Sequence, residues 1–301
     1  MVDVSPLGSM QGAPEARPAW RRAWSGIGLL PFFGFAILFM ILPVMFLVIG
    51  SFQDLQGNFT LQNYADLSQQ LTIQAYSNSI EISLVTAVAG GLFGFLLAYS
   101  VILGGLPRFL RTALMTFSGV ASNFAGVPLA LAFTFTLGFQ GLATKFLLDA
   151  FHIDLYGKAI GFSLYTKLGL EIVYMYFQFP LMVLIIAPAI DGLKRDWREA
   201  AENLGASPRQ YWQHVALPVL APTILGTMIL LFGNSFGAQA TAYQLANQVN
   251  IVTNLISAQM RGDVLFNPGL GYALAMGMVV IMGISITGYS LLQRRAERWR
   301  R

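Results

Sequence analysis

The chain has 301 residues, of which 55% are hydrophobic and only 11% are charged, and its mean hydropathy is +0.61. A soluble globular domain carries about 25% charged residues, so this composition excludes a chain that covers itself with a solvated surface. The absence of cysteine excludes a disulfide framework, a cysteine zinc site and a thiol nucleophile, and a net charge of +4 in so apolar a chain indicates membrane topology rather than nucleic acid binding.

Residues 1–24 are rich in Pro, Gly, Ser and Ala without periodicity, which predicts a disordered cytoplasmic leader. A cleaved signal peptide is not expected, because the next apolar run exceeds the ~7–15 residues of a signal core. Six apolar runs near the ~20 residues that cross a bilayer then follow. They are Ile27–Gly50, Ser79–Leu103, Ala113–Leu137, Leu168–Ile190, Val219–Gln239 and Leu270–Leu292.

The remaining segments divide the chain further. Residues 25–294 form a single predicted domain with a polar loop at 191–218, and residues 295–301 form a basic cytoplasmic tail. The run Phe139–Ile160 carries several charges and predicts an external amphipathic helix or loop rather than a span. Gly90 and Gly94 in the second run make a small-residue pair that permits close helix approach.

The distribution of basic residues tests this topology. With a cytoplasmic N-terminus, the inner segments hold 14 of the 18 Lys and Arg residues and the outer segments hold four. Five or seven spans would break the alternation, so the positive-inside rule predicts six spans with both termini cytoplasmic. The inner residues are Arg17, Arg21, Arg22, Arg108, Arg111, Lys194, Arg195, Arg198, Arg209, Arg294, Arg295, Arg298, Arg300 and Arg301, and the outer ones are Lys145, Lys158, Lys167 and Arg261.

The longest polar interruption, Asp196–Pro218, separates the fourth and fifth runs. Asp196 is placed to cap a first helix, with Glu199 as the reciprocal member of a capping box. Gly205 is placed to end that helix in the left-handed conformation.

A second helix is predicted directly after this turn. Ser207 and Gln210 form another capping-box pattern, with Pro208 at the first helical position. Pro218 is expected to close this helix before the fifth span.

Each of the two helices has an apolar face that it cannot bury alone. These faces must pack on the ends of the membrane helices or in a groove of another protein; an ordinary amphipathic loop, capped for stability, is the alternative. The first face consists of Ala200, Ala201 and Leu204, and the second of Tyr211, Trp212 and Val215.

This loop resembles the EAA motif of bacterial type I ABC importer permeases, which reads EAA, three residues, Gly, nine residues, then Ile-x-Leu-Pro. The spacing matches throughout, with valine in place of isoleucine. The wider resemblance covers roughly residues 27–294 and is greatest to the spermidine/putrescine permease group. The matching residues are Glu199-Ala200-Ala201, Gly205 and Val215-Ala216-Leu217-Pro218.

The resemblance implies an all-α permease fold with six transmembrane helices and a cytoplasmic coupling loop. It implies that Glu199, Ala200, Ala201, Leu204, Gly205, Leu217 and Pro218 dock a separate ATP-binding cassette subunit. It further implies a second permease subunit, related rather than identical, an extracytoplasmic solute-binding protein, and a bacterial inner membrane as location.

The sequence contains no G-x-x-x-x-G-K-[ST] loop, so this chain is not expected to cradle ATP phosphates itself. His152 and His214 are isolated, and no metal-ligand cluster or Ser–His–Asp pattern is present. We therefore expect a non-catalytic transport subunit without a cofactor of its own, with ATP and Mg²⁺ bound by the partner ATPase.

Polar residues inside apolar runs are costly and tend to face a bundle interior or a water-filled path. Glu81 and Glu171, near the outer ends of their runs, could attract a cationic solute such as a polyamine, or could be solvated at the interface. Asn123 and Asn234 could line the path or form interhelical hydrogen bonds. Gln178 is a further path candidate.

Two other hypotheses about the function remain open from the sequence. A self-contained secondary transporter or channel would function without an ATPase, and it gives no reason for two capped helices in the loop. A membrane scaffold without transport activity is weakly disfavoured by the polar residues within the spans.

Overall fold

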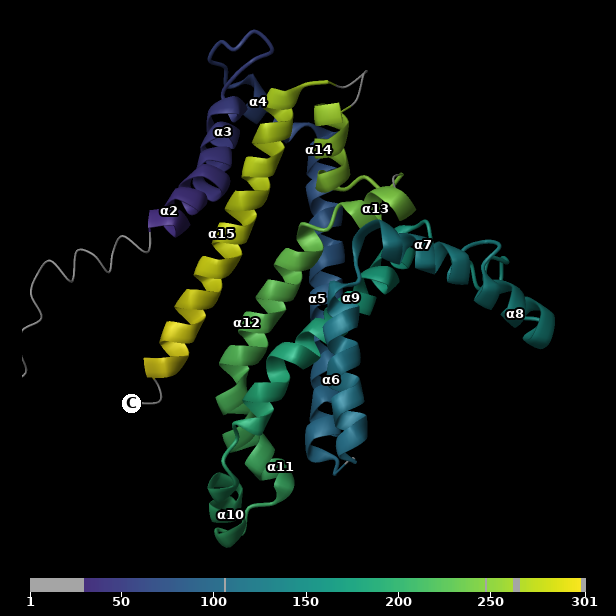
Figure 1. Cartoon of the computed structure of the whole chain (residues 1–301), viewed down its shortest axis with the longest axis vertical. Coiled ribbons are helices and arrows are strands. Elements are labelled where there is room, and N and C mark those ends of the chain that lie inside the picture. Colours follow the sequence, from purple (N-terminus) through teal and green to yellow (C-terminus); the bar gives the residue numbers. More distant parts are fainter. Residues whose placement is uncertain (1–29, 106, 247, 262–265, 299–301) are drawn as a thin grey trace, which may run out of the picture. The chain divides into compact units, whose positions relative to one another are not determined.

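The computed structural model describes residues 30–105, 107–246, 248–261 and 266–298; the predicted leader lies outside this range. Helices and loops make up these residues, without any β-strand among them (Figure 1). Six helical segments in the described part are long and apolar enough to cross a membrane, which confirms the all-α multi-pass class. They are Pro31–Ser51, Gln70–Leu103, Gly126–Phe151, Lys167–Asp191, Pro208–Phe236 and Pro268–Leu291.

Contacts divide the chain into two units, residues 1–49 and 50–301. The described part of the first unit consists of α2 (Leu30–Ala36), a π-helical turn η1 (Ile37–Ile41) and all but the last two residues of α3 (Leu42–Ser51). Its large apolar side chains are exposed on every side. Such a helix is unfavourable in water and needs an apolar environment to cover it.

The second unit is a helical bundle, in which α5, α9 and α12 pack on one another, α6 packs on α9, and α15 packs on α12 and α14. Its elements are α4 (Gln62–Ala65), η2 (Asp66–Ser68), α5 (Gln70–Leu103), α6 (Arg108–Asn123), α7 (Gly126–Leu137), α8 (Leu142–Phe151), α9 (Lys167–Asp191), α10 (Arg195–Asn203), α11 (Pro208–Tyr211), the π-helical turn η3 (Trp212–Ala216), α12 (Leu217–Phe236), α13 (Ala240–Leu245), α14 (Val252–Arg261) and α15 (Pro268–Arg298).

Glycines on α5 set the closest approach within this bundle. A Cβ atom added at Gly90 would lie 2.6 Å from the Cβ of Gln178, and one added at Gly94 would lie 2.6 Å from the Cβ of Met182, both on α9. Gly91 faces α12 instead. The predicted small-residue pair Gly90–Gly94 is therefore confirmed as a helix-contact surface.

The predicted continuous third span, Ala113–Leu137, is wrong. Helix α6 ends at Asn123, and α7 begins at Gly126, which has φ +74°. In an unbroken helix the ring of Pro128 would collide with the carbonyl of Phe124, whereas after the break Pro128 lies in the first turn of α7, where no amide donor is needed.

The predicted amphipathic segment 139–160 contains α8. By length and composition, α7 and α8 together make the third candidate span, Gly126–Phe151. The two helices are separated by a short turn and extend away from α5 and α9 (Figure 1). The sequence therefore predicted a helix here correctly, but the predicted third span, Ala113–Leu137, begins and ends earlier in the chain than the observed candidate span.

Thr241 on α13 holds the break between α6 and α7. The backbone N–H of Gly126 donates a hydrogen bond to Thr241 Oγ1 at 2.9 Å, and Thr241 Oγ1 contacts the Gly126 carbonyl oxygen at 3.2 Å. The Thr241 side chain is buried. A contact between residues 115 positions apart thus stabilises a local irregularity.

Replacing Thr241 with valine is expected to lower the free energy of unfolding by about 1–3 kcal/mol, because it leaves the Gly126 N–H unpaired at nearly constant volume. Thr241→Ser retains the hydroxyl and is expected to stay near the wild type. Thermal unfolding of both variants in detergent checks this difference, and equal midpoints for the valine variant and the wild type would contradict it.

The second loop helix does not end at Pro218, contrary to the prediction. One continuous helix runs from Pro208 to Phe236. The π-helical turn before the proline makes this possible, because the Leu217 N–H donates to the carbonyl of Trp212, five residues earlier. The wider turn relieves the clash that proline makes with the carbonyl four residues before it.

The same arrangement precedes Pro43 in the first unit. There the Leu42 N–H donates to the carbonyl of Ile37, also five residues earlier. Both π turns therefore end directly at a Leu-Pro pair and carry a helix through a proline.

Candidate functional site

The polar loop begins immediately after α9, and its first helix starts two residues earlier than predicted. Lys194 is the N-cap residue of α10, and no side chain caps this end. The predicted capping box of Asp196 and Glu199 is therefore wrong. Asp196 lies within the first turn instead, where a carboxylate is favourable because of the helix dipole.

The end of α10 is as predicted. Gly205 adopts φ +79°. The Gly205 N–H donates to the carbonyl of Glu202 and the Ala206 N–H to that of Ala201, both at 2.9 Å. These two bonds form a Schellman motif, which needs a left-handed residue at the position of Gly205.

The start of α11 is also as predicted. The Ser207 N–H donates to Gln210 Oε1 at 2.7 Å, and the Gln210 N–H donates to Ser207 Oγ at 3.3 Å. Pro208 occupies the first helical position. The capping box is thus complete, and together with the Gly205 turn it fixes the angle between the two loop helices.

The apolar face of the second helix packs on the chain's own bundle. Tyr211 and Ala216 are buried, and the ring of Trp212 lies edge-on to that of Tyr99 on α5, with centroids 4.8 Å apart. Leu217 and Pro218, which follow the π turn, are exposed at the start of α12. This helix needs no partner to cover its apolar stripe.

The apolar face of the first helix stays open. Leu204 is 88% exposed, Ala200 is exposed and Ala201 is half-buried. Trp197, 38% exposed, extends the same face by one turn. This tryptophan was not among the predicted residues of the face, although its spacing of three and four residues from the two alanines places it there.

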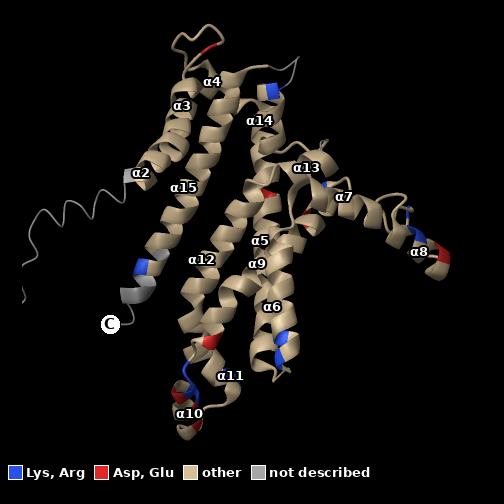
Figure 2. Ribbon diagram, in the orientation of Figure 1, with Lys and Arg blue, Asp and Glu red and all other residues tan. Residues whose placement is uncertain are grey.

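Charged residues gather on α10 and at the neighbouring end of α6, while most of α5 and α12 is uncharged (Figure 2). On α10, Arg198 Nε donates to Glu202 Oε1 at 2.9 Å, and this hydrogen bond raises the pKa of Arg198. Within the described residues, Glu199 makes no ion pair or hydrogen bond through its side chain. Its carboxylate is available to a partner.

The two glutamates predicted for the translocation path lie on neighbouring helices. Glu81 on α5 forms an ion pair with Lys167 at the start of α9, and Glu171 lies one turn further along α9. The Glu81 side chain is 58% exposed and that of Lys167 is 29% exposed. Lys167, which was not among the predicted path residues, neutralises the carboxylate of Glu81.

The three predicted amide residues have different surroundings. Gln178 is fully buried, and its Nε2 donates to the carbonyl of Leu231 on α12 at 2.8 Å. Asn123 is exposed at the end of α6, with its Nδ2 bonded to the carbonyl of Gly119 at 2.9 Å. Asn234 is exposed on α12. Gln178 therefore links α9 to α12, whereas the two asparagines are exposed at the helix surface.

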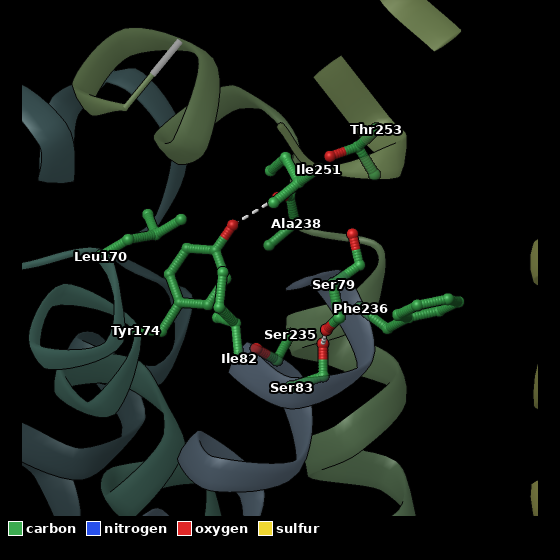
Figure 3. A pocket seen from close by; sticks show the side chains of 10 residues that line it. All are labelled: Ser79, Ile82, Ser83, Leu170, Tyr174, Ser235, Phe236, Ala238, Ile251 and Thr253. Carbon is green, nitrogen blue, oxygen red and sulfur yellow. Dashed lines mark hydrogen bonds between the residues drawn. The ribbon is translucent and has the colours of Figure 1, made fainter. Parts of the chain in front are cut away.

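A small pocket between α5, α9, α12 and the start of α14 is lined by hydroxyl groups (Figure 3). Tyr174 donates to the carbonyl of Ala238, and the Val252 N–H donates to Ser79 Oγ at 2.9 Å. The cavity measures about 10 Å³. That is room for about one water molecule, so the pocket is too small to admit a solute. The hydrogen bonds around it connect the surrounding helices.

No group of three or more His, Asp or Glu side chains is placed to bind a metal ion in the described residues. The arrangement as a whole offers a capped two-helix loop with one exposed apolar face, and a membrane bundle with polar groups on α5, α6, α9 and α12.

The chain is similar in sequence and in fold to known transport proteins. Residues 90–298 match the family described as binding-protein-dependent transport system inner membrane component. The sulfate transport system permease protein CysT of Salmonella typhimurium is 27% identical over 225 residues, which are 74% of this chain and 75% of that protein. The spermidine/putrescine transport system permease protein PotB of Haemophilus influenzae is 26% identical over 276 residues, or 88% and 94%.

A chain of a solved bacterial ABC transporter involved in the import of the acidic polysaccharide alginate has the same fold. The TM-score is 0.73 at 17% identity, covering 92% of this chain and 97% of that one. A second structure of an alginate ABC transporter, in complex with an alginate pentasaccharide-bound periplasmic protein, matches with a TM-score of 0.72 at 18% identity, covering 92% of this chain and 96% of that one.

Proposed function

Because this chain belongs to the family of binding-protein-dependent transport system inner membrane components, we propose that it forms half of a solute pathway and receives energy through residues 196–217. It is a multi-pass, non-catalytic permease subunit of an ABC importer. ATP and Mg²⁺ would be bound by a separate ATPase, which docks on α10 from the cytoplasm.

The exposed face of α10 carries this proposal. The second loop helix buries its apolar residues on the bundle, but Leu204 remains 88% exposed at the tip of the loop. A docking cleft of another protein would cover Leu204, Ala200 and Ala201, with Glu199 as the charged contact. The fixed turn at Gly205 supports this role, because it holds the face in one orientation.

The remaining partners follow from the importer architecture. A second permease subunit, related rather than identical, would complete the pathway, and a solute-binding protein would deliver the substrate from outside. The family match supports a bacterial inner membrane location, and the charge distribution supports two cytoplasmic termini.

The substrate is proposed to be a small charged solute such as a polyamine. Glu81, Lys167 and Glu171 together leave one negative charge between α5 and α9, which favours a cation. The sulfate permease relatives make sulfate the competing candidate. Uptake of radiolabelled putrescine and of sulfate by the assembled importer, each with the other as unlabelled competitor, separates the two.

Replacing Glu199 with arginine tests the docking role. In the importer reconstituted with its ATPase and binding protein, this charge reversal is expected to reduce ATPase co-purification and coupled transport by at least tenfold. Asp149→Arg, a charge reversal at another exposed acidic residue, on α8, should leave both unchanged. Normal assembly and transport in Glu199→Arg would refute docking at this loop.

The same proteoliposomes test the alternative of a self-contained secondary transporter or channel. The chain reconstituted alone, with an ion gradient but without ATPase, is expected to transport nothing. Gradient-driven uptake under these conditions would favour the alternative.

A further inference from the structure

We infer that Arg111 and Tyr99 are positioning residues for energy coupling, which fasten the two ends of the docking loop to the membrane bundle. This inference rests on the proposed function. Arg111 binds Asp191, where the chain enters the loop, and Tyr99 contacts Trp212, where the chain leaves it. Through these attachments, a movement of α10 imposed by the ATPase reaches α9 and α12.

The entry point is the last residue of α9, Asp191. Its carboxylate forms an ion pair with the guanidinium of Arg111, in the first turn of α6. Only three residues, Gly192–Lys194, separate Asp191 from α10. Both side chains of the pair are more than 40% exposed, and such exposed pairs contribute little to stability. Its effect is therefore on the orientation of the chain rather than on folding.

The exit point is Trp212 in the π-helical turn. The centroids of its ring and that of Tyr99 on α5 lie 4.8 Å apart, and the two ring planes are at 82°, which is a favourable edge-to-face geometry. From this residue the helix continues without a break into α12 as far as Phe236. Tyr99 thus fixes the base of the helix that leads from the loop into the membrane.

Between these two attachments α10 projects freely. The Gly205 turn and the Ser207–Gln210 capping box make α10 and α11 a stiff pair, so a force on α10 arrives at both attachment points. Without the attachments, the short segment after Asp191 and the wider π turn would absorb the movement. The ion pair of Arg111 transmits the movement to α6 and α9, and the ring contact of Tyr99 transmits it to α5.

The experiment uses the full importer in proteoliposomes with an unaltered docking loop. In Arg111→Ala and Tyr99→Ala, we expect ATPase co-purification within twofold of the wild type but at least a fivefold loss of substrate transported per ATP hydrolysed. Arg108→Ala removes a second exposed arginine of α6 that has no ion pair in the described part of the chain, and it should change neither quantity.

Two rescues distinguish positioning from general damage. The double variant Arg111→Asp with Asp191→Arg restores an ion pair, and Tyr99→Phe keeps the ring contact; both should restore transport per ATP. Unchanged coupling in both alanine variants overturns the inference, and so does loss of ATPase binding in either. These outcomes are independent of Glu199→Arg, whose normal assembly would instead refute the docking role itself.

Discussion

Replacing Gly94 with leucine is expected to prevent folding of the second unit. A Cβ atom at this position would lie 2.5 Å from the carbonyl oxygen of Phe179 and 2.6 Å from the Cβ of Met182. Both belong to α9, and backbone atoms cannot move aside without separating α5 from α9. Overpacking typically costs about 1–3 kcal/mol, and we expect more here because the central helix pair must open.

The yield of monodisperse protein in detergent size-exclusion chromatography, together with thermal unfolding, measures this effect. Gly283→Leu in α15 is the control, because no atom lies within 4 Å of its Cβ position. Gly91→Ala should cost less than Gly94→Leu, since its two nearest contacts, at 3.0 and 3.1 Å, are both atoms of the flexible Met228 side chain. A stable, monodisperse Gly94→Leu protein would show that the α5–α9 contact is not the packing centre.

Replacing Gly205 with valine is expected to abolish ATPase docking while leaving the membrane bundle folded. The residue has φ +79°, a conformation that costs a β-branched residue more than 1–2 kcal/mol. The strain would disrupt the two hydrogen bonds from Gly205 and Ala206 and release α10 from its fixed angle. We expect at least a tenfold loss of ATPase co-purification.

Gly205→Asn is the matched variant, because asparagine tolerates the left-handed conformation and also occurs at helix C-termini. It should retain most of the docking. The thermal unfolding midpoint of the permease should be similar in both variants, since the Gly205 position has no atom within 4 Å of its Cβ. Equal docking by the valine and asparagine variants would mean that the turn geometry does not matter.

Much of this protein follows from local sequence. The length and composition of the apolar runs determine six membrane-crossing helices, because no other structure satisfies backbone groups in lipid within one segment. The turn at Gly205 and the capping box at Ser207 were predictable because each depends on residues no more than a few positions apart. The apolar faces of the two loop helices were predictable for the same reason.

The predictions from sequence were wrong where a distant contact or an irregular helical turn determines where a helix begins or ends. The prediction from sequence lacked the break before Gly126, because that break depends on Thr241, 115 residues away. It ended the second loop helix at Pro218, although a π turn carries the helix through the proline. It placed a cap at Asp196, whereas α10 starts from Lys194.

Tertiary structure also decided which polar groups are free. Gln178 and Asn234 look alike in sequence, yet Gln178 is buried against α12 and Asn234 is exposed. Glu81 is paired with Lys167, 86 positions later, while Glu199 has no partner within the described chain. Local sequence determines helices and caps because their hydrogen bonds join near neighbours; only the packed bundle determines which faces and charges remain for a partner.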